Sequence, residues 1–112
     1  MLSGSVPCAR LHAHHVLREW SLAALSDDVE LVVSELVTNA IKVSAQAISL
    51  WLMSDGMRAA VFVQDSSPLP PVPRDADEDS TDGRGLVIVD ALAQRWGAYP
   101  VADGKIVWAV VC

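Results

Sequence analysis

The sequence predicts one α+β domain, a two-layer sandwich of helices on a mostly antiparallel sheet. Two long segments with helical periodicity come first, and two pairs of short apolar segments follow, with a further helical segment between the pairs. Helices and antiparallel strands in this order pack as two layers. Because 112 residues suit one domain, we expect a single domain over 1–112.

The first two helices follow from apolar periodicity and from their start signals. Ser5 and Pro7 are residue types that begin helices, and the periodic segment behind them predicts a helix over about 6–20. A second helix is expected to begin at Ser26, because the acidic residues that follow suit the positive end of a helix dipole. Its apolar arc continues to about residue 43.

Four apolar segments predict strands, at 47–53, 57–64, 95–101 and 105–111. Ser-Asp-Gly joins the first pair and Ala-Asp-Gly the second, and both are hairpin turn signals. Between the pairs, Gly83-Arg84-Gly85 is expected to begin a helix over 86–92. The two hairpins therefore supply the sheet of the sandwich.

Residues 66–82 differ in composition from the rest of the chain. Four prolines fall within the six positions 68–73, and five acidic residues follow within 75–82. An unstructured loop of this length in a compact domain is usually functional or disordered. We therefore expect a long loop at 66–82 that takes no part in the core.

The composition excludes several functions. The net charge is −6 and the eight basic residues are scattered, so direct binding to nucleic acid is not expected. No apolar stretch is long enough to span a membrane, and the N-terminus has no signal-peptide pattern. Cys8 and Cys112 lie near opposite ends and are expected to be free thiols, which favours a cytoplasmic protein.

Glu35 and Asn39 are the first candidate site residues. They are four apart on the second helix, so both lie on one face. An amide oxygen can bind Mg²⁺, and a carboxylate beside it can accept a proton from an attacking hydroxyl. The same two residue types also occur on many solvated helix faces, so this pair alone does not define a site.

Two further signals follow along the chain. Asp65 comes directly after an apolar strand, where a carboxylate can accept a hydrogen bond from an exocyclic amine; Asp-Ser-Ser-Pro is also ordinary turn chemistry. Gly83-x-Gly85 precedes a helix, and glycines there let backbone N–H groups approach phosphate closely. A lone Gly-x-Gly is a weak signal, but the order of all three is much more specific.

Taken together, these motifs resemble the histidine-kinase-like (GHKL) ATPase superfamily, in particular the anti-sigma-factor serine kinases of actinobacteria. The matching segments are Val-Ser-Glu-Leu-Val-Thr-Asn-Ala at 33–40, Asp65-x-Ser67-Pro68, Gly83-Arg84-Gly85-Leu86, Asp90-Ala91-Leu92, Arg95-Trp96-Gly97 and Val107-Trp108-Ala109. The resemblance runs from about residue 6 to the end of the chain. It implies a Bergerat-type ATP-binding fold that lacks the first edge strand.

The resemblance also implies a role for each candidate residue. Asn39 would bind Mg²⁺, Glu35 would be the catalytic carboxylate, and Asp65 would contact the adenine amino group of ATP. The phosphates would lie along Gly83, Arg84 and Gly85, with 66–82 as the ATP lid.

The implied function is that of an anti-sigma factor with Mg-ATP-dependent serine kinase activity toward an anti-anti-sigma factor. The alternative is a catalytically weak or inactive module of the same fold that sequesters a partner protein. Relatives of this kind usually carry His four residues after the Asn, where this chain has Val43. A sheet without its first edge strand would leave an edge unpaired, so a homodimer that buries this edge is a further expectation.

Overall fold

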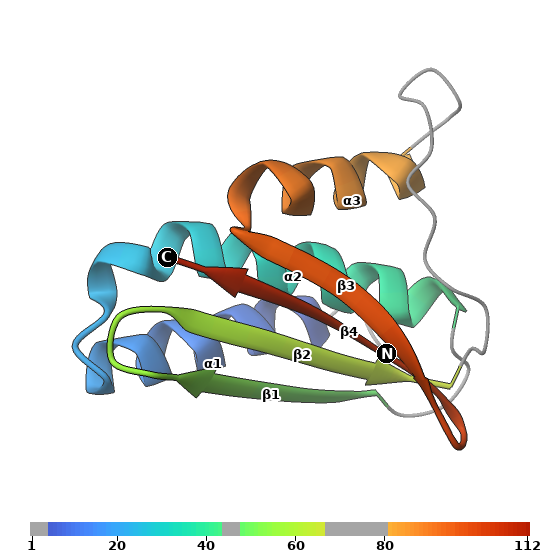
Figure 1. The fold of residues 1–112 in the computed structure, drawn as a ribbon, viewed down its shortest axis with the longest axis horizontal. Helices are drawn as coiled ribbons and strands as arrows, with labels where there is room; N and C mark the ends of the chain where they lie inside the picture. The colour runs from blue at the N-terminus through green and yellow to red at the C-terminus, as the bar shows by residue number, and fades with distance from the viewer. Residues whose placement is uncertain (1–4, 44–47, 67–80) are drawn as a thin grey trace.

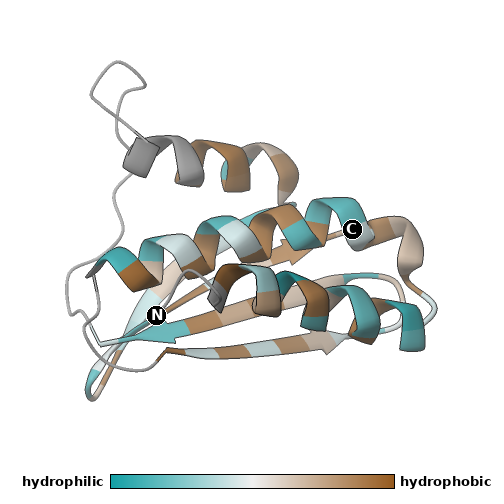
Figure 2. Ribbon diagram, turned by 180° about the vertical axis from the view of Figure 1, so that it is seen from behind, coloured by the Kyte–Doolittle hydropathy of each residue, from teal (hydrophilic) through white to brown (hydrophobic). Residues whose placement is uncertain are grey.

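The computed structural model describes residues 5–43, 48–66 and 81–112. Helices and strands follow one another in the order α1 (Ser5–Glu19), η1 (Ala23–Leu25), α2 (Ser26–Val43), β1 (Ser49–Ser54), β2 (Ala59–Asp65), α3 (Thr81–Leu92), β3 (Arg95–Val101) and β4 (Gly104–Val111). The four strands form one antiparallel sheet with the order β1-β2-β4-β3. The three α-helices lie together on one side of it (Figures 1 and 2), which confirms the predicted two-layer α+β fold.

Helices α1 and α2 match the predicted ranges closely, and each buries one side against the sheet or its neighbour. In α1 the buried residues are Ala13 and Leu17, one turn apart. In α2 the buried apolar positions are Val29, Val32, Val33, Leu36, Val37 and Ala40. This wide apolar arc leaves only a narrow accessible stripe along α2, because α1, α3 and the sheet all pack around it.

Helix α3 begins earlier than predicted. We expected a helix over 86–92 with the Gly-x-Gly segment at its head, but α3 starts at Thr81 and includes both glycines. Glycine weakens a helix interior by only about 1 kcal/mol, so packing can outweigh it. Leu86 and Val89 are buried and supply that packing. The helix predicted here is therefore confirmed, but its start at residue 86 and the end of the preceding loop at residue 82 were placed too late.

The strands follow the predicted segments, shifted by one or two residues at most ends. The predicted start of the first strand, residue 47, lies outside the described residues. Along β2 and β4 every second residue is buried, as expected for strands with one face against a helical layer. The buried residues of β2 are Ala59, Val61, Val63 and Asp65, and those of β4 include Lys105, Val107, Ala109 and Val111. This alternation builds the core, and it also places one acid, Asp65, and one lysine, Lys105, on the inner face of the sheet.

A polar cluster joins α1 to the start of α2. His14 Nδ1 lies 2.9 Å from Glu30 Oε2 and 3.3 Å from Ser26 Oγ. Ser26 also donates a hydrogen bond to Glu30. Burial raises the pKa of Glu30, but the hydrogen bonds from Ser26 and His14 outweigh this and the pKa is lowered overall. The cluster fixes the two helices relative to each other and has a structural role.

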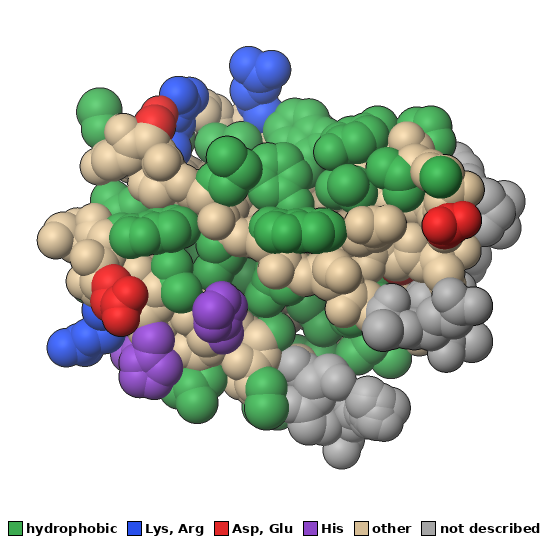
Figure 3. All heavy atoms as spheres, turned by 90° about the horizontal axis from the view of Figure 1, so that it is seen from below, with side chains coloured by type: hydrophobic (Ala, Val, Ile, Leu, Met, Phe, Trp, Pro, Cys, Tyr) green, Lys and Arg blue, Asp and Glu red, His purple; other side chains and the backbone are tan. Residues whose placement is uncertain are grey.

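The two edges of the sheet differ. Strand β1 contains no charged residue and no proline, whereas β3 carries Arg95 and Pro100, residue types that discourage a further strand. Within 5–43, 48–66 and 81–112, no strand precedes α1 and none pairs with the outer edge of β1. Hydrophobic side chains spread over the β1 side of the molecule, with the charged groups mostly at its margins (Figure 3).

None of the helices in the described ranges is long and apolar enough to cross a membrane. Cys8 and Cys112 are exposed free thiols, as expected from their positions in the sequence.

Candidate functional site

Glu35 and Asn39 lie on successive turns of α2, as the sequence predicted. Both side chains are half-buried, while Leu31 before them and Lys42 after them are exposed. They therefore occupy the stripe of α2 that neither the sheet nor the neighbouring helices fully cover. A carboxylate and an amide are thus held side by side on a rigid helix, and both remain accessible to a small ligand.

The ends of three elements gather at the same end of the molecule as Asn39. The C-terminal end of α2, the end of β2 and the start of α3 all lie toward the right-hand end of the molecule in Figure 1. Strand β4 begins at this end too, since Asp65 and Lys105 are cross-strand partners. The candidate residues on α2, β2 and α3 are therefore brought to one end, although they are far apart in the sequence.

Asp65 is buried at the end of β2 and forms an ion pair with Lys105. The ammonium Nζ lies 3.1 Å from Oδ1 and 3.0 Å from Oδ2, so it contacts both oxygens. The side chain of Asp65 is 2% exposed and that of Lys105 is 7% exposed. Charged groups buried this far are normally paired, because an unpaired charge in a core is very costly. Asp65 thus has the position that the sequence predicted, but it already has a strong partner.

Sequence reasoning missed Lys105. The available signal was the alternation of β4, which places Lys105 in phase with the inward-facing Val107 and Ala109. A lysine in that phase must either find a carboxylate or leave the core. Its partner is forty residues earlier in the chain, so the pairing of β2 with β4 was needed to identify it.

Gly104 holds the backbone of Asp65 in place. A Cβ atom at Gly104 would lie 1.9 Å from the carbonyl oxygen of Asp65 and 2.8 Å from the Cα of Ser66. No side chain can be accommodated at that distance, so only glycine permits this approach between the end of β2 and the start of β4. At Asp65 the start of β4 therefore contacts the backbone through Gly104 and the carboxylate through Lys105.

At the first turn of α3, the backbone amides of Thr81 to Gly83 have no carbonyl partner within the helix. Such amides, together with the helix dipole, can bind phosphate. Gly85 lies further along, where its N–H group belongs to the intrahelical ladder. The side chains of 81–85, including Arg84, and that of Val43 lie outside the described part of the structure, as does the predicted lid from 67 to 80.

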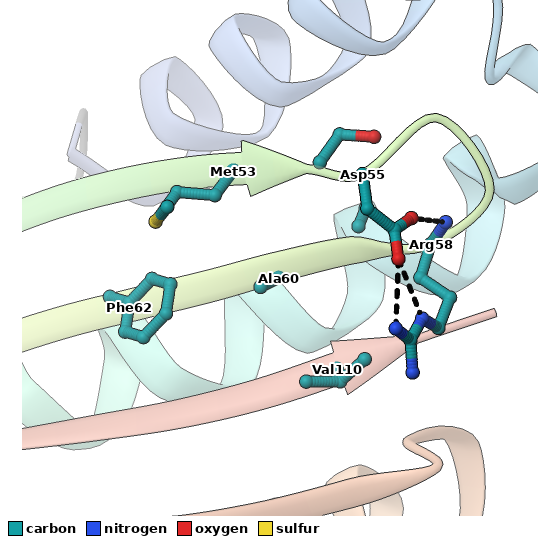
Figure 4. A pocket seen from close by; sticks show the side chains of 8 residues that line it. Met53, Asp55, Arg58, Ala60, Phe62 and Val110 are labelled. Atoms are coloured by element: carbon teal, nitrogen blue, oxygen red, sulfur yellow. Dashed lines mark hydrogen bonds and ion pairs between the residues drawn. The ribbon is translucent and has the colours of Figure 1, made fainter.

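A separate shallow hollow of about 280 Å³ lies on the outer face of the sheet, remote from these residues. Met53, Ala60, Phe62 and Val110 line it, and Asp55 and Arg58 flank it at the β1–β2 turn (Figure 4). Asp55 accepts hydrogen bonds from the backbone N–H of Met57 and from the Arg58 guanidinium, which hold its pKa well below the usual range. The ion pair fixes the hairpin, and the hollow is mostly apolar.

The structure is a small α+β domain in which a carboxylate lies at the end of β2 and a carboxylate and an amide lie half-buried on α2. The family model of the histidine kinase-like ATPase domain matches residues 2–111 of the chain. The chain therefore belongs to the histidine kinase-like ATPase domain family, and ATP is the ligand that this family membership implies. The comparison with curated proteins gave no match.

Proposed function

We propose that this chain binds Mg-ATP at the end of the molecule where α2, β2 and α3 converge. The observation that carries the proposal is the half-buried pair Glu35 and Asn39 on α2, at the end of the fold that also holds Asp65 and the first turn of α3. In this arrangement Asp65 accepts a hydrogen bond from the adenine amino group. The phosphates lie toward Gly83, Arg84 and Gly85, and the lid expected from the sequence would be the part of 66–82 that precedes α3, most of which lies outside the described residues.

The residues present fit a magnesium ion that reaches the site with its nucleotide. Among the described residues, no three His, Cys, Asp or Glu side chains lie together as a metal site. Mg²⁺ differs from zinc in that it often takes one or two protein oxygens and fills its remaining positions with phosphate and water. The amide oxygen of Asn39 suits this role, and the bound ion would offset the negative charge of the phosphates.

The catalytic role falls to Glu35. Phosphoryl transfer mainly requires that the protein positions the reactants and stabilises charge. Glu35 is one helical turn from Asn39, so its carboxylate can accept the proton of a hydroxyl that attacks the terminal phosphate. We propose a protein serine hydroxyl as the attacking group, and therefore serine kinase activity.

The partner proteins are proposed from the resemblance of the sequence to anti-sigma-factor serine kinases. The substrate serine would belong to an anti-anti-sigma factor, and the chain itself would sequester a sigma factor and so regulate transcription from the cytoplasm. The negative net charge of −6 agrees with action through proteins and not through direct contact with nucleic acid.

The alternative function, a binding module with weak or absent catalysis, is favoured by two observations. The Asp65 carboxylate is held by Lys105, so the adenine end of the site is not free in this structure. The outer face of the sheet meanwhile offers apolar side chains to a partner: Trp51 is 47% exposed and Met53 is 59% exposed. A chain with this surface can bind proteins whether or not it transfers phosphate.

A titration with fluorescent ATP tests the main proposal. Wild type should bind in a Mg²⁺-dependent manner, and Asn39→Ala should lose this dependence. Asp28→Ala is the matched control, since Asp28 is an exposed residue near the start of the same helix. Equal, negligible signal in wild type and Asn39→Ala would favour the binding module.

Incubation with labelled ATP and a candidate anti-anti-sigma protein then tests for the kinase. Wild type should transfer label to a serine, and Glu35→Gln should bind Mg-ATP but transfer little. A Glu35→Gln variant that transfers label at the wild-type rate would remove Glu35 from the proposed mechanism.

A further inference from the structure

The ion pair between Asp65 and Lys105 lies at the point where the proposed function needs a hydrogen-bond acceptor. Asp65 is the group proposed to receive the adenine amino group, yet the Lys105 ammonium is within 3.1 Å of both of its oxygens. An ammonium and an exocyclic amine are both N–H donors and seek the same acceptor atoms. The lysine therefore occupies the place that the base would take.

Because the ion pair is buried, the Lys105 ammonium and the adenine amino group compete for the Asp65 carboxylate. On a surface, a carboxylate could accept from two donors at once because it has about four acceptor positions. Here the side chain of Asp65 is only 2% exposed and that of Lys105 only 7% exposed. Gly104 also packs directly against the backbone of Asp65, so the chain at this end of β2 has little room to move. Because so little of this carboxylate is exposed, we infer that a base contacting Asp65 takes over one of the contacts made by Lys105.

We propose that Lys105 is an internal competitor for the adenine base and sets the affinity of the site for nucleotide. The inference rests on the proposed function, since it concerns the same site. In the empty protein the ammonium neutralises Asp65 and stabilises the joined ends of β2 and β4. When nucleotide binds, the amino group of adenine replaces one contact of the lysine.

The consequence is an affinity that can be changed in both directions at one position. Lys105→Met keeps the length of the side chain but removes the charge, so the base no longer has to displace an ammonium from Asp65. Lys105→Arg strengthens the competitor, because a guanidinium can hold both carboxylate oxygens with two parallel N–H groups. Hydrogen bonds to charged groups change equilibria by roughly tenfold or more, so effects of this size should be measurable.

The test is a titration with Mg-ATP that carries its fluorophore on the ribose, so that the base is unaltered. Lys105→Met should bind at least about fivefold more tightly than wild type, and Lys105→Arg at least about threefold more weakly. Arg18→Met is the matched control: Arg18 is exposed in the last turn of α1, and its loss changes the net charge by the same amount. This control should bind like wild type.

Inorganic tripolyphosphate, used as a competitor, separates a base effect from a general one. It has no amine to place against Asp65, so its affinity should not rise in Lys105→Met. Equal tightening for ATP and tripolyphosphate would overturn the proposal. So would Lys105→Met binding ATP no more tightly than wild type.

Three outcomes keep the inference distinct from the proposed function and from a folding defect. If wild type binds Mg-ATP with the expected loss in Asn39→Ala but Lys105→Met binds no more tightly, only the role of Lys105 fails. If wild type binds no nucleotide at all, the proposed function fails and this inference with it. Should circular dichroism show that Lys105→Met is unfolded, Lys105→Arg decides: affinity equal to or above wild type overturns the proposal.

Discussion

Gly104 lies against the backbone of Asp65 so closely that a Cβ at Gly104 would be 1.9 Å from the Asp65 carbonyl oxygen. Gly104→Ala must therefore displace the end of β2, the start of β4 or both. Overpacking in a tight site commonly costs about 1–3 kcal/mol, and a clash with backbone should reach at least about 3 kcal/mol. Urea unfolding followed by circular dichroism measures the loss.

Gly56→Ala is the control for this prediction. Gly56 has a φ of +96°, which strains an alanine, but nothing lies within 4 Å of the added atom. Its cost should be about 1–2 kcal/mol, from backbone strain alone. If Gly56→Ala destabilises the protein more than Gly104→Ala does, the backbone at Asp65 can move aside and the close contact does not require glycine.

The candidate site residues that could be placed from sequence are those whose position depends on a single helix or strand. Glu35 and Asn39 share one helix, so their spacing alone placed them correctly on one accessible stripe. Asp65 was placed at a strand end for the same reason. Its ion pair was not foreseen, because cross-strand register decides which residue of β4 faces it. The start of α3 was also missed, since local glycine propensity was outweighed by the burial of Leu86 and Val89.

Ser34 offers a second stability prediction. It is 8% exposed, and within the described part of the chain its Oγ atom has no hydrogen-bond partner. A buried unpaired hydroxyl is unfavourable, and alanine is also the better helix former. Ser34→Ala should therefore raise the free energy of unfolding by about 0.5–1 kcal/mol.

Ser26→Ala should lower the free energy of unfolding, whereas Ser34→Ala should raise it, although both replace a serine in the same helix. The Ser26 hydroxyl donates a hydrogen bond to Glu30, so its removal should destabilise the protein by about 1 kcal/mol. Thermal melts of both variants check the pair. Destabilisation by Ser34→Ala would mean that its hydroxyl has a partner after all.

Glu30 makes the stability of the α1–α2 contact depend on pH. Burial raises its pKa, but hydrogen bonds from Ser26 and His14 prevail and lower it in the folded protein below the ordinary value of 4.5. The unfolded chain therefore binds the proton more readily. Glu30 therefore stabilises the fold fully at pH values above its pKa in the unfolded chain. This stabilisation is lost as the pH falls through the lower pKa that Glu30 has in the folded protein.

Glu30→Gln tests this dependence. The stability difference between wild type and Glu30→Gln should be greatest at about pH 6 and should shrink toward about pH 3, measured by urea unfolding across this range. Asp103→Asn, in the exposed turn between β3 and β4, controls for the loss of one carboxylate. A wild-type advantage that stays constant from high to low pH would show that ionisation of Glu30 does not stabilise the fold.

The uncharged edge of β1 carries the last prediction, a homodimer formed by pairing of β1 with β1 of a second copy. Trp51 is central in this strand and 47% exposed, and the β1 side of the molecule is largely hydrophobic (Figure 3). An exposed apolar edge strand without charge or proline readily pairs with another strand. Light scattering should give twice the chain mass of 12.0 kDa at high concentration.

Trp51→Lys should shift this equilibrium to the monomer, because a lysine on the edge strand places two like charges close together in the symmetric dimer. Tyr99→Lys is the matched control, since Tyr99 is 45% exposed on β3, the edge that already carries Arg95 and Pro100. It should leave the dimer intact. A wild-type monomer at high concentration, or a dimer disrupted only by Tyr99→Lys, would contradict pairing through β1, and the second result would place the interface on β3.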